Sequence, residues 1–277
     1  MGLDQKEFRC RTLHDKSKRA KARVSPESFP ESWRMSVEVL ARSSEYERAR
    51  GEMRRRGIDF TCPWPLRVLH KIRLVKGVSV GDVRKSWDVL KTIQFVEEKV
   101  SKTSPILDMG AYASEILCIL HKLGFSDLTG IDFNPKLACM PYAGAIKYVP
   151  GDFTQTAFAS ETFGAITAIS VLEHGFCSAT VLREVSRILR PGGYFIGSID
   201  YWPEKLDTNG VRVFGVDWRI FSRGELESLI QEAGSFGMVP VGQLNFEASE
   251  TTVSWFRRQY TFAWFALQKV NRVGCES

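Results

Sequence analysis

The chain lacks several features that would assign it to other protein classes. It has no run of about 18 apolar residues, so no membrane-spanning helix is predicted. Its start, from Met1 to Lys6, has no apolar signal segment, and we expect a cytoplasmic protein. The six cysteines are scattered without a C-x-x-C pair, which argues against a metal site and a disulfide framework. No G-x-G-x-x-G fingerprint is present, which disfavours a dinucleotide-dependent dehydrogenase.

Positive charge is concentrated in the first third of the chain. Residues 1–100 contain 23 Lys and Arg against 14 Asp and Glu, whereas the remainder contains 15 against 18. We expect residues 1–30 to form a basic flexible arm. Residues 31–100 are predicted to form a helical extension, with helices over 31–56 and 82–100. Nucleic-acid binding by this region is an alternative that we do not favour, because aromatic residues are not interleaved with the charges.

Short apolar strands alternate with helical segments from residue 101 onward. This order predicts an α/β fold over 101–277, with a Rossmann-like, mostly parallel sheet and helices on both faces. Pro240 predicts that residues 238–242 form an edge strand, because proline cannot donate to a sheet ladder. Residues 260–267 are apolar or small on both faces and predict an interior strand. The first five strands are expected at 104–109, 128–131, 146–149, 165–170 and 194–199.

Carboxylates follow the first three predicted strands. Asp108, Asp132 and Asp152 stand at these ends, and open α/β sheets bind ligands at the carboxyl ends of their strands. Asp108 would repel a pyrophosphate beside the first turn. The carboxylates suit a ligand with an ammonium group, ribose hydroxyls and an adenine amine. Asp132 follows Asp108 at nearly the roughly 20-residue offset of a ribose-binding acid.

Other residues near these ends complete the predicted ligand site. Gly110 permits close approach of the backbone to the ligand. A helix beginning near Ser114 would present free N–H groups to a ligand carboxylate. Asp152 and Phe153 are expected to contact an adenine. The full set of predicted cofactor-binding residues is Asp108, Gly110, Tyr112, Ser114, Asp132, Phe133, Asp152, Phe153 and Ser170.

Five sequence blocks in this order resemble class I S-adenosylmethionine-dependent methyltransferases, specifically the branch related to ubiquinone and menaquinone biosynthesis. The blocks are Ile106–Gly110, Thr129–Pro135, Gly151–Phe153, Val171–His174 and Ile188–Tyr194. The resemblance implies S-adenosyl-L-methionine as the cofactor and a small-molecule acceptor. It also implies a seven-stranded sheet whose last strand is antiparallel and inserted beside the edge. A looser similarity to methyltransferases of bacterial polysaccharide biosynthesis suggests a sugar or secondary-metabolite hydroxyl as the acceptor.

The chain departs from the resembled family in its first turn. The family usually has glycine where Tyr112 stands, and often where Ser114 stands. The Tyr112 ring must therefore point away from the cofactor or stack against it. Loss of cofactor binding would instead make the chain a non-catalytic binding module. We favour a small-molecule methyltransferase over this module and over a nucleic-acid or protein methyltransferase.

The loop after the fourth strand supplies the candidate catalytic residues. His174 is the candidate base, because the pKa of histidine suits proton transfer near neutral pH. Glu173 is expected to bind the cofactor or to orient His174. The acceptor is expected to contact aromatic residues before the first strand and after the fifth, namely Trp87, Tyr201, Trp202 and Trp218. No metal is expected, and the oligomeric state is left open.

Overall fold

The computed structural model describes residues 35–61 and 78–270. The predicted arm over 1–30 lies outside the described residues. The helices are α1 (Ser43–Arg55), η3 (Val83–Lys85), α3 (Ser86–Lys99), α4 (Ile116–Lys122), η4 (Pro135–Cys139), α5 (Ser178–Ile188) and α6 (Arg223–Ser235). The strands are β1 (Met35–Val39), β2 (Ile106–Met109), β3 (Leu128–Asp132), β4 (Lys147–Pro150), β5 (Phe163–Ile169), β6 (Leu189–Tyr201), β7 (Arg212–Val213), β8 (Val216–Asp217), β9 (Met238–Pro240), β10 (Gln243–Leu244), β11 (Val253–Trp255) and β12 (Arg258–Lys269). Within these ranges, none of the helices is both long and apolar enough to cross a membrane.

The main sheet has ten strands in the order β10-β1-β12-β6-β5-β2-β3-β4, with β9 and β11 also paired to β12. Strands β2 to β6 are parallel to their neighbours in this order, and β12 is antiparallel to β6. The predicted fold class is therefore confirmed. The strand count exceeds the seven that the resemblance implies, because β1, β10 and β11 add to β2–β6, β9 and β12. The predicted interior position of residues 260–267 is also confirmed, since β12 pairs with strands on both sides.

The N-terminal extension contributes a strand as well as helices. The helix predicted over 31–56 is wrong at its start, because Met35–Val39 forms β1 and pairs antiparallel with β12. Val37 and Val39 alternate with more polar residues and are 0% and 4% exposed, which is the pattern of a strand. The helix itself, α1, ends in basic residues before Gly57, which has a φ of +67°. The helix predicted over 82–100 is confirmed as α3.

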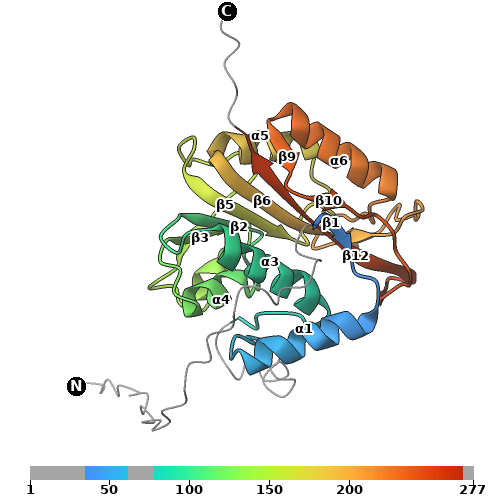
Figure 1. The fold of residues 1–277 in the computed structure, drawn as a ribbon, viewed down its shortest axis with the longest axis horizontal. Coiled ribbons are helices and arrows are strands. Elements are labelled where there is room, and N and C mark those ends of the chain that lie inside the picture. Colours follow the sequence, from blue (N-terminus) through green and yellow to red (C-terminus); the bar gives the residue numbers. More distant parts are fainter. Residues whose placement is uncertain (1–34, 62–77, 271–277) are drawn as a thin grey trace, which may run out of the picture. The chain divides into compact units, whose positions relative to one another are not determined.

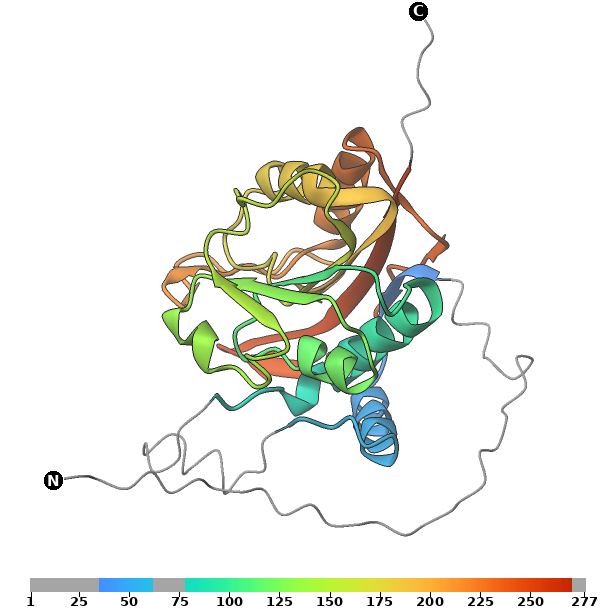
Figure 2. The ribbon, with the colours of Figure 1, turned by 90° about the vertical axis from the view of Figure 1, so that its left-hand side faces the viewer.

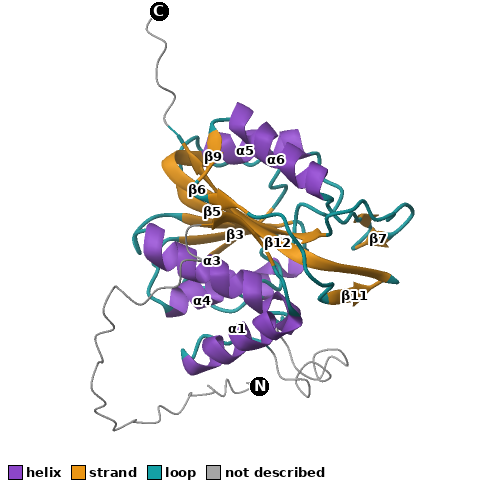
Figure 3. Ribbon diagram, turned by 45° about the vertical axis from the view of Figure 1, so that its right-hand side comes forward, coloured by secondary structure: helices purple, strands orange, loops and turns teal. Residues whose placement is uncertain are grey.

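Helices cover both faces of the sheet. Figures 1 and 3 show α3 and α4 on one face and α5 and α6 on the other, and α1 lies against α3 on the side away from the sheet. Figure 2 shows the same layers from the side, with the blue and green helices below the sheet and the yellow and orange helices above it. Neighbouring residues of β2 point to opposite faces, so Ile106 joins the core cluster under α3 and Leu107 the cluster under α5.

The strand order reverses between β2 and β5. From β2 the chain adds β3 and β4 on one side, and it then returns to add β5 and β6 on the other. Ligands of open α/β sheets bind at the carboxyl ends of the strands beside such a reversal. The fold thus places the loops after β2 and β5 beside each other, where the sequence predicts the site.

Candidate active site

Asp108 lies near the end of β2 and is 1% exposed. One carboxylate oxygen, Oδ1, accepts a hydrogen bond of 2.6 Å from the Thr167 hydroxyl of β5. The other oxygen, Oδ2, is buried and has no protein partner. Burial raises the pKa of Asp108 to about 7, with hydrogen bonding from the Thr167 and Ser114 side chains opposing the shift and the charge of Asp132 adding to it. The structure thus holds a buried acceptor atom ready for a ligand donor.

The turn after β2 folds back against β3. Gly110 has a φ of +74°, and a Cβ atom at this position would lie 2.5 Å from Val171 Cγ2, so only glycine fits. The Tyr112 amide donates to Asp132 Oδ2 at 3.0 Å, and the Asn134 amide donates to Oδ1 at 2.8 Å. Each carboxylate oxygen can accept a further hydrogen bond. The turn therefore orients the Asp132 carboxylate and leaves each of its oxygens able to accept a hydrogen bond from a ligand.

The two residues that replace family glycines are accommodated by the turn. The half-buried Tyr112 side chain packs against the core cluster on the α3 and α4 face. The Ser114 hydroxyl accepts a hydrogen bond of 3.3 Å from the Ile116 amide at the start of α4. The helix begins at Ile116 with Glu115 as its N-cap, so the start expected near Ser114 is shifted by two residues.

Aromatic rings gather beyond Asp132. Phe133 is 54% exposed, and Phe153 beneath it is buried. The ring centroids of Phe133 and Phe153 are 5.4 Å apart, and Phe176 lies 4.7 Å from Phe153. Asp152 is exposed, and its Oδ1 accepts the amide and hydroxyl of Thr154 at 2.7 Å each. The sequence reasoning missed Phe176, although it stands two residues after His174 in the same loop.

The loop after β5 carries three polar side chains with unpartnered atoms. Ser170 has a φ of +54°, and its buried Oγ lies near the Glu173 carboxyl without a well-formed hydrogen bond. Glu173 is 1% exposed, and its Oε2 has no partner. Burial, followed by the charge of Asp200, raises the pKa of Glu173 to about 8. His174 is half-buried, its Nδ1 has no partner, and burial lowers its pKa. At neutral pH, His174 is thus the better proton acceptor of the two.

Unpartnered buried atoms concentrate in this part of the described chain. Buried polar groups are normally hydrogen-bonded, so each exception calls for an explanation. Four of the six such atoms belong to residues that the sequence analysis placed in the site. The six are Ser79 Oγ, Asp108 Oδ2, Ser170 Oγ, Glu173 Oε2, His174 Nδ1 and Arg219 Nε. This concentration at the ends of β2 and β5 indicates a ligand site.

A buried charge cluster lies beside Glu173, at the end of β6. Asp200 is 4% exposed and accepts a hydrogen bond of 2.8 Å from Trp218 Nε1 at its Oδ2. The Lys85 ammonium lies 3.5 Å from Asp200 Oδ1 and 3.8 Å from Asp88 Oδ2. It also lies 3.2 Å from the ring centroid of Phe262. The sequence reasoning missed Asp200, because the fifth strand was expected to end at residue 199.

The predicted acceptor residues lie in different environments. Trp87 and Trp218 are 8% and 2% exposed, and Trp202 is half-buried. Trp218 reaches the charge cluster through Asp200, as described above. Tyr201 is fully buried in the core cluster on the α5 and α6 face, and its hydroxyl donates to the Phe246 carbonyl at 2.7 Å. Tyr201 therefore faces away from the side of the sheet that carries Asp108.

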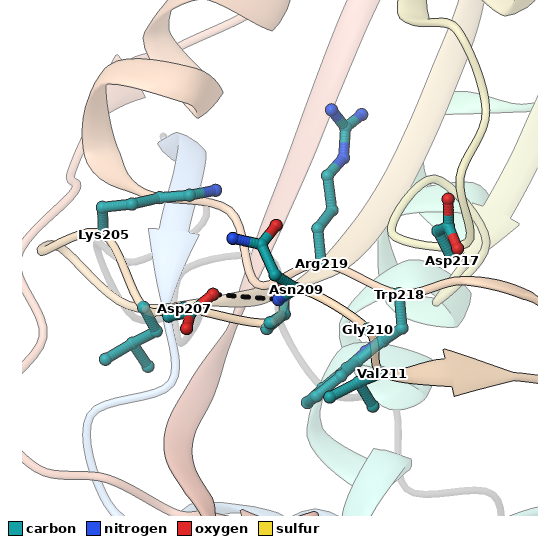
Figure 4. A pocket seen from close by; sticks show the side chains of 10 residues that line it. Lys205, Asp207, Asn209, Gly210, Val211, Asp217, Trp218 and Arg219 are labelled. Atoms are coloured by element: carbon teal, nitrogen blue, oxygen red, sulfur yellow. Dashed lines mark hydrogen bonds between the residues drawn. The ribbon is translucent and has the colours of Figure 1, made fainter.

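A cavity of about 500 Å³ lies along the connection between β6 and α6 (Figure 4). It is lined by Lys205, Leu206, Asp207, Thr208, Asn209, Gly210, Val211, Asp217, Trp218 and Arg219. Asp207 Oδ1 accepts a bond of 2.9 Å from the Asn209 amide, drawn in Figure 4. Since Trp218 also bonds Asp200, it links this cavity to the buried charge cluster. Among residues 35–61 and 78–270, no group of three His, Cys, Asp or Glu is arranged to hold a metal.

Comparison with known families decides the class of the domain. Residues 107–197, which include Asp108, Asp132 and Glu173, match the family described as a methyltransferase domain. The chain contains a methyltransferase domain. The expected class I S-adenosylmethionine-dependent family, with its cofactor, is therefore confirmed, whereas the ubiquinone-related branch stays a prediction. The match begins within β2 and ends within β6, so the methyltransferase domain holds the loops after β2 and β5.

Several known proteins are similar to parts of this chain. A segment of 104 residues is 30% identical to the sterol 24-C-methyltransferase erg-4 of Neurospora crassa, covering 35% of this chain and 27% of that enzyme. The match thus spans about a quarter of the relative. The geranyl diphosphate C-methyltransferase of Streptomyces coelicolor A3(2) aligns with a TM-score of 0.50 and 14% identity, covering 65% of this chain and 80% of that chain. A methyltransferase structure from Methanosarcina mazei gives a TM-score of 0.47 at 14% identity, covering 63% and 96%.

Proposed function

We propose that the chain transfers a methyl group from S-adenosyl-L-methionine to a small-molecule acceptor. The observation that carries the proposal is the buried, unpartnered Oδ2 of Asp108 at the end of β2. A carboxylate without a partner is costly in a protein interior, and an ammonium group is the donor that relieves this cost best. The methionine part of the cofactor has such a group.

The residues at neighbouring strand ends fit the other parts of the cofactor. Asp132 would accept hydrogen bonds from the ribose hydroxyls, since each of its oxygens keeps acceptor capacity. The exposed Phe133 ring and the buried Phe153 ring offer an apolar surface for adenine, and Asp152 stands beside them. Gly110 keeps the backbone close to the site without a side chain.

The loop after β5 is proposed to serve the acceptor. The bound cofactor supplies a methyl carbon on a positively charged sulfur. His174 accepts the proton that a hydroxyl acceptor loses, because its Nδ1 is free and its lowered pKa keeps it neutral. Glu173, held neutral by burial and by Asp200, orients the acceptor or His174 by hydrogen bonding at its free Oε2.

We propose a small, neutral or weakly polar acceptor with a hydroxyl group, such as a sugar or a secondary metabolite. The similar proteins are named for a sterol and for geranyl diphosphate, which are also small molecules. The buried aromatic side chains Trp218, Tyr260 and Phe262 contact the charge cluster, and such rings suit the apolar face of a small ligand.

Calorimetric titration with S-adenosylmethionine and with S-adenosylhomocysteine tests the proposal. We expect both ligands to bind the wild type and NAD not to bind, because Asp108 would repel a pyrophosphate. Asp108→Ala is expected to abolish binding. The exposed Asp127, which precedes β3, offers a matched control in Asp127→Ala that should bind normally. Absence of binding to the folded wild type would refute the methyltransferase proposal.

A further inference from the structure

Arg50 of α1 is a buried cation that joins four parts of the chain. It is 2% exposed. Its Nη2 and Nη1 donate to Glu115 Oε1 and Oε2 at 2.9 and 3.2 Å. Nη1 also donates to Asp59 Oδ1 at 2.7 Å, and Nε donates to Ser86 Oγ at 2.8 Å. The Asp82 carbonyl accepts the remaining bond, at 3.2 Å from Nη2. Only the rigid, planar fork of a guanidinium can serve all these acceptors at once.

Glu115 is the last residue of the turn that follows β2, and we name residues 110–115 the cofactor loop. Glu115 is 2% exposed and is the N-cap residue of α4. Gly81 packs against its carboxyl group, since a Cβ on Gly81 would lie 2.9 Å from Glu115 Cδ. The Gly81 amide donates to the Ala113 carbonyl at 3.0 Å. The segment before α3 therefore touches the cofactor loop at two points.

The cofactor loop needs outside support because of its own sequence. Ala113 adopts a φ of +63°, a left-handed conformation that is unfavourable for a residue with a side chain. Tyr112, one residue earlier, must keep its amide 3.0 Å from Asp132 Oδ2. A loop with glycines at these positions could adopt this course with little strain. Here, the contacts from Arg50 and Gly81 hold the strained part of the loop in place.

We propose that Arg50 is a positioning residue for cofactor binding: by holding Glu115, it fixes the cofactor loop that orients Asp132. The N-terminal extension is then part of the cofactor site, although it lies outside the matched methyltransferase domain. The inference rests on the proposed function for the identity of the ligand. Its structural part, the dependence of the loop on Arg50, is independent of that ligand.

The test compares variants of the full chain by affinity for S-adenosylhomocysteine and by amide hydrogen exchange. In Arg50→Met we expect binding about tenfold weaker or worse, which corresponds to one lost hydrogen bond of ordinary net strength. Amides of residues 110–118 should exchange faster, whereas those of β5 should not change. Arg50→Lys keeps the positive charge but lacks the planar guanidinium with its several donors. Its affinity should therefore lie between those of Arg50→Met and the wild type. Arg54→Ala is the control, because Arg54 bonds the same Asp59 from a side chain that is 66% exposed.

A second variant keeps the test decisive if Arg50→Met does not fold. Gly81→Ala leaves every donor of Arg50 in place, but it presses a methyl group against the Glu115 carboxyl and strains a backbone with a φ of +77°. It should weaken binding and speed loop exchange in the same way. Unchanged affinity and unchanged exchange in either folded variant would overturn the inference while leaving the proposed function intact. If the wild type binds neither cofactor nor product, the proposed function fails, and hydrogen exchange of residues 110–118 in the unliganded variants still tests whether the loop depends on Arg50.

Discussion

Cofactor affinity should depend on pH through Asp108. The pKa of this carboxyl is raised to about 7, chiefly by burial. Only the ionised form can pair with an ammonium group, so protonation of Asp108 competes with binding. The affinity should therefore fall as the pH is lowered through 7. Each unit of pH below that point should cost up to about tenfold in affinity.

The magnitude follows from the fraction of ionised Asp108. At pH 7 about half of the carboxyl groups are ionised, and at pH 5.5 about 3% are, which predicts a roughly 16-fold loss of affinity between the two. Binding at pH 7 should release about half a proton per ligand. The ligand amine stays charged over this range, because α-amino groups titrate near about 7.7–8.0. The pH dependence is thus assigned to the protein.

Calorimetry in buffers of different ionisation enthalpy measures the affinity and the proton release together. S-adenosylhomocysteine has the same ammonium group and should show the same dependence. Methylthioadenosine, which lacks the amino-acid part, should bind weakly and without this pH dependence. The reasoning is refuted if the affinity for S-adenosylhomocysteine is flat between pH 5.5 and 7, or if methylthioadenosine shows an equal dependence.

The same carboxyl should destabilise the unliganded protein at high pH. Its pKa in the folded chain is above the ordinary value of 3.8, so the unfolded chain loses its proton first as the pH rises. The contribution of Asp108 to the free energy of unfolding is therefore fully present below about pH 4 and is lost as the pH rises through about 7. The loss is on the order of 4 kcal/mol. Asp108→Asn should flatten this part of the stability curve in urea unfolding experiments, and an unchanged curve would contradict the assignment.

Three other substitutions test single features of the site. Gly110→Ala should lower the free energy of unfolding by about 1–3 kcal/mol more than Gly192→Ala. Both glycines have a positive φ, but only Gly110 is crowded by a neighbouring side chain, that of Val171. Equal losses of stability for the two variants in urea unfolding would contradict this expectation. Trp218→Phe should cost about 1.5–3 kcal/mol, because the buried Asp200 loses a hydrogen bond; the same assay measures it, and no loss would exclude the bond's contribution. His174→Ala should slow methyl transfer by about 10²–10⁴-fold without changing cofactor affinity, and unchanged turnover would remove His174 from the mechanism.

The strand ends that carry the proposed cofactor residues could be predicted from the sequence, because these residues follow strands in a regular order. Asp108, Asp132 and Asp152 each stand at a strand end, and parallel strands bring such ends to one edge. Local apolar runs were sufficient to locate these strands. The alternation of strands and helices predicts parallel strands, and this is sufficient to bring the carboxyl ends to one edge of the sheet.

The residues that escaped prediction depend on contacts between distant parts of the chain. β1 was read as helix, because its pairing with Ala263, Trp264 and Phe265 joins the two ends of the chain. Arg50 is one of several basic residues of α1, and nothing local distinguishes the buried one from its solvated neighbours. The sequence analysis placed Tyr201 in a loop after the fifth strand. In the structure Tyr201 is the last residue of β6, and its side chain is buried in the core.

The charge cluster at the end of β6 connects the two halves of the proposed site. Lys85 faces two carboxylates, Asp88 and Asp200, at 3.8 and 3.5 Å, and the neutral carboxyl of Glu173 lies close enough for the charge of Asp200 to raise its pKa. Burial raises the pKa of Asp88 and opposes its ionisation, so Lys85 serves chiefly Asp200, the nearer of the two carboxylates. Trp218 bonds the same Asp200 carboxylate and also lines the cavity between β6 and α6. Asp200 is therefore the residue that joins Lys85, the loop after β5 and that cavity.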